Sequence, residues 1–407
     1  MQPVVAVIGG GAAGFFGALT IAAHRPGVRV MIFEKTGKVL SKVRVSGGGR
    51  CNVTHDCFQP GKLATFYPRG GRMLKKLFGR FSASDTVQWF KERGVELKTE
   101  ADGRIFPVSD SSQTIIDLFM REASRLGVEI RTRCVVTEIA PDDEGFSLTT
   151  SEGMMRANKV LVSAGGHSKE SAYDWLKNLG HEIIPPVPSL FTFNVPREGL
   201  NDLAGIALPD ARVKVEGSKW EYTGPLLITH WGFSGPAVLK TSAWAARDFF
   251  EKKYAFNIHV SWNASAGEEA VRALIHTYLS DHGTRKIHKY PLMDLPQRLW
   301  TRLCERAEIE PNRTWAELPK KNRNKLVEEL VRSHYTVAGK TTFKEEFVTA
   351  GGVALTSVNA KTMESKHING MYFSGEILDV DGVTGGFNFQ AAWSTAFIAG
   401  KAISTSI

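Results

Sequence analysis

The stretch that decides the fold is VVAVIGGGAAGFFGALTIAAH, residues 4–24. It opens with a short apolar run rich in β-branched residues (4–8) and closes with an alanine-rich run (12–24), and a cluster of glycines separates the two. This order predicts a strand, a tight turn and a helix. The segment from Pro3 to Ala23 carries no charge, but the glycine turn interrupts it and no basic segment precedes it. We therefore favour strand, turn and helix over a signal peptide or a membrane span.

The glycines of this turn have the spacing GxGxxG, which is typical of dinucleotide binding. Gly9 permits the bend, Gly11 lets a pyrophosphate approach the backbone, and Gly14 lets the helix pack on the strand. An acidic residue is expected at the end of the next strand, and VRVMIFEK places Glu34 there, where its carboxylate can accept hydrogen bonds from ribose hydroxyls. The motif by itself leaves FAD and NAD open, and a glycine-rich turn without a ligand is the structural alternative.

Two further glycine clusters, at 45–55 and 382–386, suggest that one long ligand is contacted several times. VSGGGRCNVTH (45–55) combines glycines with an arginine, a thiol and an asparagine, and NKVLVSAGG (158–166) reads as a second strand that ends in a small-residue turn. GMYFSGEILDVDGVTGGFNFQAAW (370–393) predicts a strand, an acidic loop, a glycine turn and a helix that begins near Phe387. The N-terminus of that helix suits the electron-rich edge of a reduced flavin. The alternative is an ordinary turn capped by Asn388 or by Asp381.

Length and pattern predict several domains. With 407 residues, of which 43% are hydrophobic, the chain is long enough for two or three. Strands and helices alternate until a proline-rich exit near Pro188, short alternating runs follow, and helical apolar spacing begins near Ser265. We expect a first domain of 1–188 and 351–407, a β-rich second domain of 189–264 and 335–350, and a helical insert of 265–334.

The charge of the chain indicates which partners to expect, and its cysteines indicate the cellular compartment. Lys and Arg exceed Asp and Glu by 51 − 42 = 9, and basic clusters lie at 69–80, 285–289 and 320–325, with aromatics in or beside the first two. Such clusters are typical of a surface that binds structured RNA, and solvated faces are the alternative. The four cysteines have neither CxxC nor metal-ligand spacing, so we expect free thiols, no metal site and a cytoplasmic location.

The motifs VIGGGAAG, SGGGRCNVT, GRIFPVSDSS, THWGFSGPAVL, VTAGGV, TMESK and the C-terminal stretch quoted above together resemble the BaiN-like (YhiN-like) flavoproteins, which include aminoacetone-oxidase-type members. The resemblance extends almost from end to end. It implies an α/β fold: an FAD-binding Rossmann-like domain of the two-dinucleotide-binding-domain type, interrupted by a β-rich, barrel-like domain that carries a helical insert. It implies FAD as the bound cofactor. No second GxGxxG exists, so NAD(P)H, the expected reductant, would dock transiently.

The resemblance also assigns cofactor contacts. The first glycine turn and Glu34 would hold the ADP part, Val136 would contact the adenine, and 164–166 would pass near the pyrophosphate. Residues 46–52 would wrap the ribityl and isoalloxazine parts, and the C-terminal cluster would contact the ribityl, the pyrophosphate or the flavin ring. The residues implied are Gly9, Gly11, Ala12, Ala13, Gly14, Glu34, Lys35, Ser46, Gly47, Gly48, Gly49, Arg50, Cys51, Asn52, Val136, Ala164, Gly165, Gly166, Gly375, Glu376, Asp379, Gly385, Gly386, Phe387, Asn388 and Phe389.

Two side chains are candidates for proton handling. Cys51 adjoins Arg50, whose charge would favour a thiolate, and the alternative is a small buried thiol. His230, in THWGFSGP, would face the active site from the second domain, or else is a structural histidine. Glu376 is better interpreted as a cofactor ligand.

Three functions remain open on the sequence. A flavin reductase that converts uracil to dihydrouridine in ribosomal RNA would use both the flavin and the basic clusters. A small-molecule enzyme, either an amine oxidase or an enone reductase, would need only the flavin. A non-catalytic, redox-sensing flavoprotein would leave flavin and substrate uncoupled.

Overall fold

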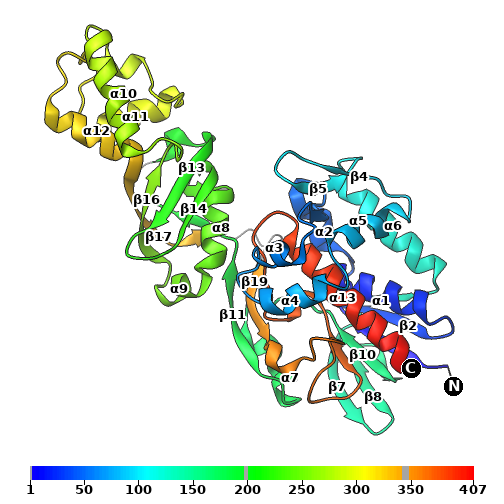
Figure 1. Cartoon of the computed structure of the whole chain (residues 1–407). Coiled ribbons are helices and arrows are strands. Elements are labelled where there is room, and N and C mark those ends of the chain that lie inside the picture. Colours follow the sequence, from blue (N-terminus) through cyan, green and yellow to red (C-terminus); the bar gives the residue numbers. More distant parts are fainter. Residues whose placement is uncertain (1, 197–199, 342–347) are drawn as a thin grey trace. The chain divides into compact units, whose positions relative to one another are not determined.

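The structure, a computed structural model, describes residues 2–196, 200–341 and 348–407. The chain divides into two compact units, one formed by Met1–Ser189 with Phe343–Ile407 and the other by Leu190–Thr342 (Figure 1). Both units mix helices and strands, so the α/β class is confirmed. Within the described residues, no helix is both long and apolar enough to cross a lipid bilayer.

A five-stranded parallel sheet forms the centre of the first unit. Its middle strand is β1 (Val4–Ile8), followed by α1 (Ala12–His24), as the glycine pattern predicts. The strand order is β20-β10-β1-β2-β6, so the chain continues from β1 to β2 on one side and later adds β10 on the other. At such a switch point the carboxyl ends of neighbouring strands leave a crevice for a ligand. The other strands are β2 (Arg29–Glu34), β6 (Glu129–Thr132), β10 (Lys159–Val162) and β20 (Met371–Phe373).

The last helix, α13 (Phe387–Ser406), begins at the predicted residue and packs against α1 (Figure 1). Small residues allow the two backbones to approach, because a Cβ atom added at Gly400 would lie 2.8 Å from Cβ of Thr20 and 3.0 Å from the carbonyl oxygen of Gly17. Most of α1 is buried in consequence. This burial explains why the N-terminal segment is uncharged.

Smaller elements surround this core. The antiparallel sheet β3-β5-β4 lies next to the glycine loop at 46–49, and the sheet β7-β8-β9 follows β6 in the chain. The strands are β3 (Thr54–His55), β4 (Leu97–Thr99), β5 (Arg104–Pro107), β7 (Val136–Asp142), β8 (Gly145–Thr150), β9 (Gly153–Ala157), β11 (Ile183–Ser189) and β19 (Val348–Val353). The helices are α2 (Ser41–Gly49), α3 (Pro60–Ala64), α4 (Gly71–Phe78), α5 (Ala83–Lys91), α6 (Ser112–Arg125) and α7 (Asp174–Asn178).

The second unit contains an antiparallel seven-stranded sheet with helices. One hydrophobic core joins the two parts, since Phe193 and Val213 of the sheet belong to the same buried cluster as Trp300 and Leu326 of the helical segment. The strand order is β17-β16-β13-β14-β15-β12-β18. The strands are β12 (Thr192–Asn194), β13 (Ala207–Val215), β14 (Glu221–Thr229), β15 (Gly232–Ser234), β16 (Ala255–Ser261), β17 (Ser333–Ala338) and β18 (Lys340–Thr341), and the helices are α8 (Pro236–Trp244), α9 (Ala246–Glu251), α10 (Glu268–Asp281), α11 (Gln297–Arg306) and α12 (Lys320–Arg332).

One predicted domain limit differs from the structure. We expected 335–350 to belong to the second domain, but β19 begins at Val348 and pairs antiparallel with β11 inside the first unit. The reason is a partner from far away in the chain: Ala350 pairs with Val187, and both are buried. The segment 342–347, which the same prediction covers, lies outside the described residues.

Candidate flavin site

The first glycine turn is built for close backbone packing on one side and open space on the other. The N–H of Gly9 donates to the carbonyl of Phe33 (2.8 Å), and a Cβ atom added at Gly9 would lie 2.4 Å from the carbonyl oxygen of Ser163. A Cβ atom at Gly14 would lie 1.9 Å from the carbonyl oxygen of Gly9, so the helix could not approach the turn with any larger residue. A Cβ atom at Gly11 would meet nothing within 4 Å. The open side is where a pyrophosphate can approach the start of α1.

Glu34 ends β2 beside this turn. Its carboxylate accepts hydrogen bonds from the N–H groups of Gly10 (3.0 Å) and Thr36 (2.8 Å), which fix its position next to the glycines. The N–H of Cys134 donates to the carbonyl of Glu34 (3.0 Å), so the segment that leads to Val136 runs past the same strand end. The arrangement suits a ribose and an adenine.

The second glycine cluster turns sharply. Gly47, Gly48 and Gly49 have φ values of 59°, 69° and 84°, which L side chains rarely adopt. A Cβ atom added at Gly47 would lie 2.9 Å from the ring of Phe106, whereas at Gly48 and Gly49 it would meet nothing within 4 Å. Two adjacent backbone positions are therefore open on their side-chain face, which suits the approach of a flat ring.

The third cluster meets the second. Gly386 has a φ of 87° and caps α13, and a Cβ atom there would lie 2.5 Å from the carbonyl oxygen of Thr54. The side-chain amide of Asn52 is oriented so that both its nitrogen and its oxygen have hydrogen-bond partners. It donates to the carbonyl of Thr54 (2.9 Å) and accepts from the N–H of Gly386 (2.9 Å). The second and third glycine clusters, more than 300 positions apart in the sequence, thus lie side by side.

The residues present fit an FAD. Gly11, Gly48, Gly49 and Gly165 are each open on the side where a Cβ atom would stand, and Gly9 brings Ala164 beside the first turn. The N-terminus of α1 offers unpaired N–H groups to a pyrophosphate. These are the residues that would hold the cofactor, and the individual contacts remain predictions.

Two of the side chains assigned to the cofactor also hold the loops in place. Asn388 both accepts from the N–H of Gly382 (2.8 Å) and donates to its carbonyl (2.9 Å). The carboxylate of Glu376 pairs with Lys42 (2.6 Å) and accepts from the N–H of Thr349 (2.8 Å). Their hydrogen bonds shape the turns that face the site.

Apolar packing fixes other assigned residues. Gly375 has a φ of 73°, and a Cβ atom there would lie 2.7 Å from Cβ of Ala13, so these two positions face each other. Phe387 is buried, and its ring stacks on Phe66 with a centroid distance of 4.4 Å. Phe389 stacks on Trp393 at 5.5 Å. These rings support the start of α13.

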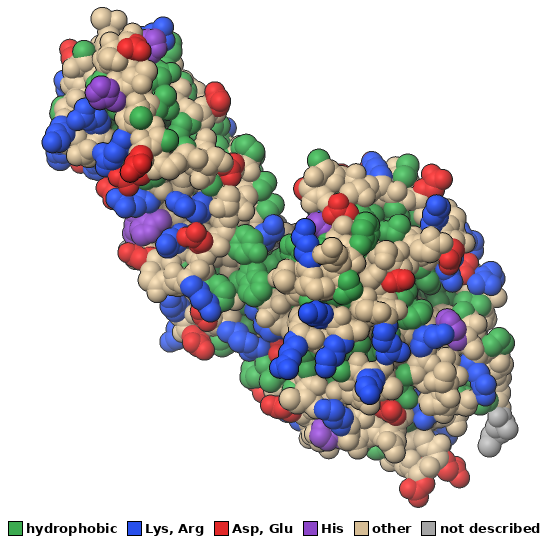
Figure 2. Space-filling view, viewed as in Figure 1, with side chains coloured by type: hydrophobic (Ala, Val, Ile, Leu, Met, Phe, Trp, Pro, Cys, Tyr) green, Lys and Arg blue, Asp and Glu red, His purple; other side chains and the backbone are tan. Residues whose placement is uncertain are grey.

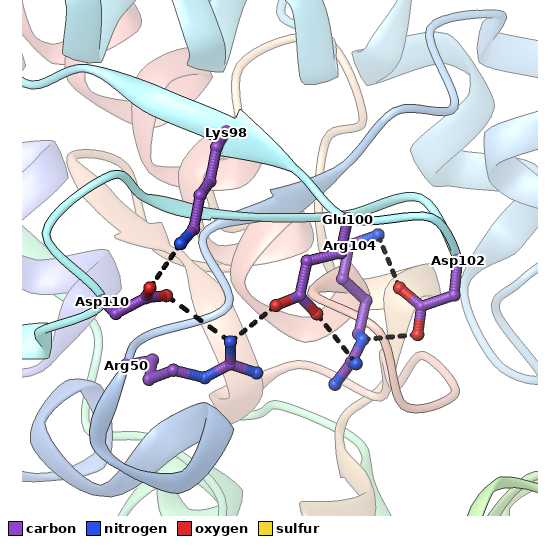
Figure 3. A network of polar contacts seen from close by, with 6 residues as sticks. All are labelled: Arg50, Lys98, Glu100, Asp102, Arg104 and Asp110. Carbon is purple, nitrogen blue, oxygen red and sulfur yellow. Dashed lines mark hydrogen bonds and ion pairs between the residues drawn. The ribbon is translucent and has the colours of Figure 1, made fainter.

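Arg50 belongs to a polar network that joins the glycine loop to the β4–β5 hairpin (Figure 3). Its guanidinium donates to Glu100 (2.6 Å), lies 3.5 Å from Asp110, and stacks over the ring of Phe106 at 4.0 Å. Arg104 extends the network by pairing with the other oxygen of Glu100 (2.9 Å). Asp102 and Lys98 complete it through Arg104 and Asp110. Arg50 therefore positions the loop, a role that the sequence analysis did not assign.

Of the two interpretations of Cys51, the structure favours the small buried thiol over the thiolate. The side chain is fully buried, and burial raises the pKa of Cys51 to about 12. The charge of Arg50 cannot lower this pKa as expected, because it is directed toward Glu100 and Asp110. The alternative of a small buried thiol describes the residue. His230 lies exposed in the turn between β14 and β15 of the second unit, and its role in proton handling remains a prediction.

Arg69 does not belong to the exposed part of the basic cluster predicted at 69–80. Its guanidinium pairs with both oxygens of Asp381, which also accepts from the hydroxyl of Ser189 (2.8 Å). Asp381 is fully buried, and burial raises the pKa of its carboxyl while Arg69 opposes that rise. Arg69 is thus used inside the protein. In the sequence, only the acidic loop that contains Asp381 indicated that a nearby cation could have a partner there.

Tyr67 is a further residue that the sequence analysis missed. Its buried hydroxyl donates to the carbonyl of Phe387 (2.7 Å), and burial raises the pKa of Tyr67 well above its usual value. The N–H of Val383 donates to the carbonyl of Phe66 (3.0 Å) in the same region. The segment before α4 is therefore bonded directly to the glycine turn of α13.

This fold and this site define the class of protein: it is an FAD-dependent oxidoreductase with a Rossmann-type domain. The chain belongs to the family described as HI0933-like protein Rossmann domain, whose sequence profile matches residues 3–402. The resemblance to the BaiN-like flavoproteins is confirmed by this match and by the relatives.

Two curated relatives have different named activities. The chain is 28% identical to the 3-dehydro-bile acid delta(4,6)-reductase of Clostridium scindens, over 98% of both chains. It is 29% identical to the ribosomal RNA dihydrouridine synthase of Escherichia coli, over 96% of this chain and 95% of the relative.

Solved structures share the fold. The 3-ketosteroid delta1-dehydrogenase of Sterolibacterium denitrificans has a TM-score of 0.55 at 11% identity, with 99% of both chains covered. A flavocytochrome c3 fumarate reductase has a TM-score of 0.51 at 16% identity, with 99% of this chain and 78% of that chain covered. At these identities the likeness concerns architecture alone.

Proposed function

We propose that the protein reduces uracil to dihydrouridine in RNA, with NAD(P)H as the reductant. In the net reaction the C5=C6 bond of uracil gains one hydride and one proton, and NAD(P)H loses the hydride. When bound, FAD supplies the two-electron chemistry that links these half-reactions. The relatives from Escherichia coli and Haemophilus influenzae that are named ribosomal RNA dihydrouridine synthases, each 29% identical, support ribosomal RNA as the substrate.

The observation that carries this proposal is the exposed basic face of α4. Arg72, Lys75 and Lys76 point to solvent, while Met73 and Leu74 on the opposite face are buried. None of the three cations forms an ion pair with any residue in the part of the chain that the structure describes. Figure 2 shows Lys and Arg side chains gathered over the part of the first unit where α4 lies. Cations without acidic partners are free to neutralise phosphates.

The other two basic clusters are weaker candidates. In the cluster 320–325, Lys321 and Lys325 both pair with Glu308, at 3.4 Å and 2.8 Å. In the cluster 285–289, Lys286 donates to the side chain of Asn312 (2.7 Å). Glu308 offsets part of the charge of the cluster 320–325, whereas the cations of α4 have no acidic partner among the described residues, so α4 is the stronger phosphate surface.

The basic helix belongs to the same unit as the cofactor site. α4 packs against α13, and the hydrogen bond from Tyr67 to the carbonyl of Phe387 joins the segment before α4 to the turn of α13. A phosphate backbone held on α4 would therefore be held at a fixed place relative to the glycine turn. This favours a substrate that is anchored through its backbone while one base enters the site.

A second candidate is the reduction of a small conjugated enone. The bile acid reductase supports it at 28% identity. Both named reactions saturate a carbon–carbon double bond conjugated to a carbonyl group, so they would require the same cofactor chemistry. They differ in whether the basic face of α4 is used.

The deciding experiment is anaerobic reduction of the purified protein by NADPH, followed by reoxidation. In separate samples the reduced flavin meets unmodified ribosomal RNA, a steroid enone or air. Reoxidation fastest with RNA, together with dihydrouridine in the recovered RNA, would support the proposal. Reoxidation by the enone alone would support the second candidate, and rapid reoxidation by air alone would contradict both.

A further inference from the structure

Phe58 is exposed at the surface of the first unit. Its side chain is 48% exposed, although the flanking Cys57 is buried and the nearby Leu63 is completely buried. A single exposed apolar side chain is common on protein surfaces, so exposure alone assigns nothing. Its surroundings in the sequence are unusual, because residues 57–80 contain no Asp or Glu and, besides Arg69, which pairs with Asp381, five Lys or Arg.

The two helices that follow Phe58 in the chain, α3 and α4, carry exposed cations. Lys62 of α3 is exposed and follows Phe58 by four positions in the chain. A Cβ atom added at Gly61 would lie 3.8 Å from Cε of Lys75, so the basic face of α4 adjoins α3. The nearest acid in sequence, Asp56, lies 3.1 Å from His55.

Contacts with the loop that contains Val380 and Asp381 hold this surface in place. Gly70 has a φ of 78°, and a Cβ atom there would lie 2.5 Å from the side chain of Val380. The adjacent Arg69 pairs with the buried Asp381 of the same loop. The α3–α4 segment is thereby fastened to the loop that precedes the glycine turn of α13, so its surface is formed before a ligand arrives.

An exposed aromatic ring among cations suits unpaired nucleotides. The cations can neutralise successive phosphates, and the ring can stack on a base. In a duplex the bases already stack on each other, so an exposed ring finds a free base only in loops, bulges and ends. This chemistry distinguishes single-stranded from double-stranded RNA.

We propose that the α3–α4 surface, defined by Phe58, Lys62, Arg72, Lys75 and Lys76, binds an unpaired RNA strand, with Phe58 as the stacking platform for a base. The inference rests on the proposed RNA substrate and narrows it to single-stranded segments. Phe58 fixes the strand next to the target uridine, and the lysines and Arg72 hold its backbone.

The test measures binding of the FAD-loaded protein to a labelled, uridine-containing single-stranded oligonucleotide and to the matching duplex, by fluorescence anisotropy over a range of salt. Phe58→Ala should weaken single-strand binding by about 5- to 150-fold, the range of base–aromatic stacking, without changing the salt dependence. Phe58→Trp should restore it. Lys75→Ala should lower the slope of log K against log salt by about 0.7, the value for one phosphate contact on a single strand.

The outcomes distinguish the stacking role of Phe58 from the proposed RNA substrate. If Phe58→Ala binds the single strand as tightly as the unchanged protein, the stacking platform is refuted, while the proposed function still stands. Equal loss of duplex and single-strand binding would refute the preference for unpaired RNA. If the unchanged protein binds neither RNA, both proposals fail. Flavin absorbance checks folding, and Phe58→Leu, which keeps the apolar bulk without an aromatic ring, replaces Phe58→Ala if that variant loses FAD.

Discussion

Replacing Arg69 by methionine would remove the cation that faces the buried carboxylate of Asp381. The side chain of Asp381 has no exposed surface and that of Arg69 is 13% exposed, so water cannot replace the lost partner. Breaking a buried ion pair from one side costs about 3–5 kcal/mol. Because about 1 kcal/mol lowers the melting temperature of a domain of this size by about 2–4 °C, we expect Arg69→Met to lower it by about 6–20 °C.

The penalty should depend on pH in a defined direction. Burial raises the pKa of Asp381 and Arg69 opposes that rise, so the pKa rises further when Arg69 is removed. Between the pKa of the unfolded chain and the higher pKa of the folded protein, the folded protein binds more protons, and stability falls as the pH rises. The loss caused by Arg69→Met should therefore be larger at pH 8 than at pH 5.

Thermal unfolding at several pH values, followed by circular dichroism and by the fluorescence of released flavin, measures both effects. Arg72→Met is the matched control, since Arg72 is exposed and forms no ion pair among the described residues, and we expect a change within about 0.5 kcal/mol. An Arg69→Met protein as stable as the control at pH 8, or one whose penalty grows as the pH falls, would refute the reasoning.

Three other predictions concern the site. Gly11→Leu should keep the fold, because the space beside Gly11 is open, but lose FAD, whereas Gly14→Ala should unfold the turn; circular dichroism and flavin absorbance separate the two outcomes. The double change Lys75→Glu with Lys76→Glu should slow reoxidation by RNA at least tenfold and leave FAD content unchanged; equal reoxidation would contradict a phosphate role. Burial raises the pKa of Cys51 to about 12, so this thiol should resist alkylation in the folded protein at pH 8. Rapid labelling of Cys51, seen by mass spectrometry, would contradict this.

Much of the fold followed from local patterns. The strand at 4–8, the helix at 12–24 and the start of a helix at Phe387 depend on periodicity and on glycine spacing within a few residues, and the structure has all three where they were expected. Glu34 likewise ends its strand beside the first turn. Local sequence carries this information because strand, turn and helix are selected by neighbouring side chains.

The roles of individual polar side chains depend on partners that are distant in the sequence. Arg69 was predicted to face RNA, but its partner Asp381 stands 312 positions away, and no local pattern pairs them. Arg50 likewise pairs with Glu100 on a hairpin that folds back over the glycine loop. For Cys51 the sequence left a thiolate and a buried thiol open, and the fold favours the buried thiol. The sequence by itself determined the dinucleotide-binding elements and the places where the backbone can admit a ligand, and only the tertiary structure decided which charges remain free for a substrate, because burial and distant partners set the energy of a charge.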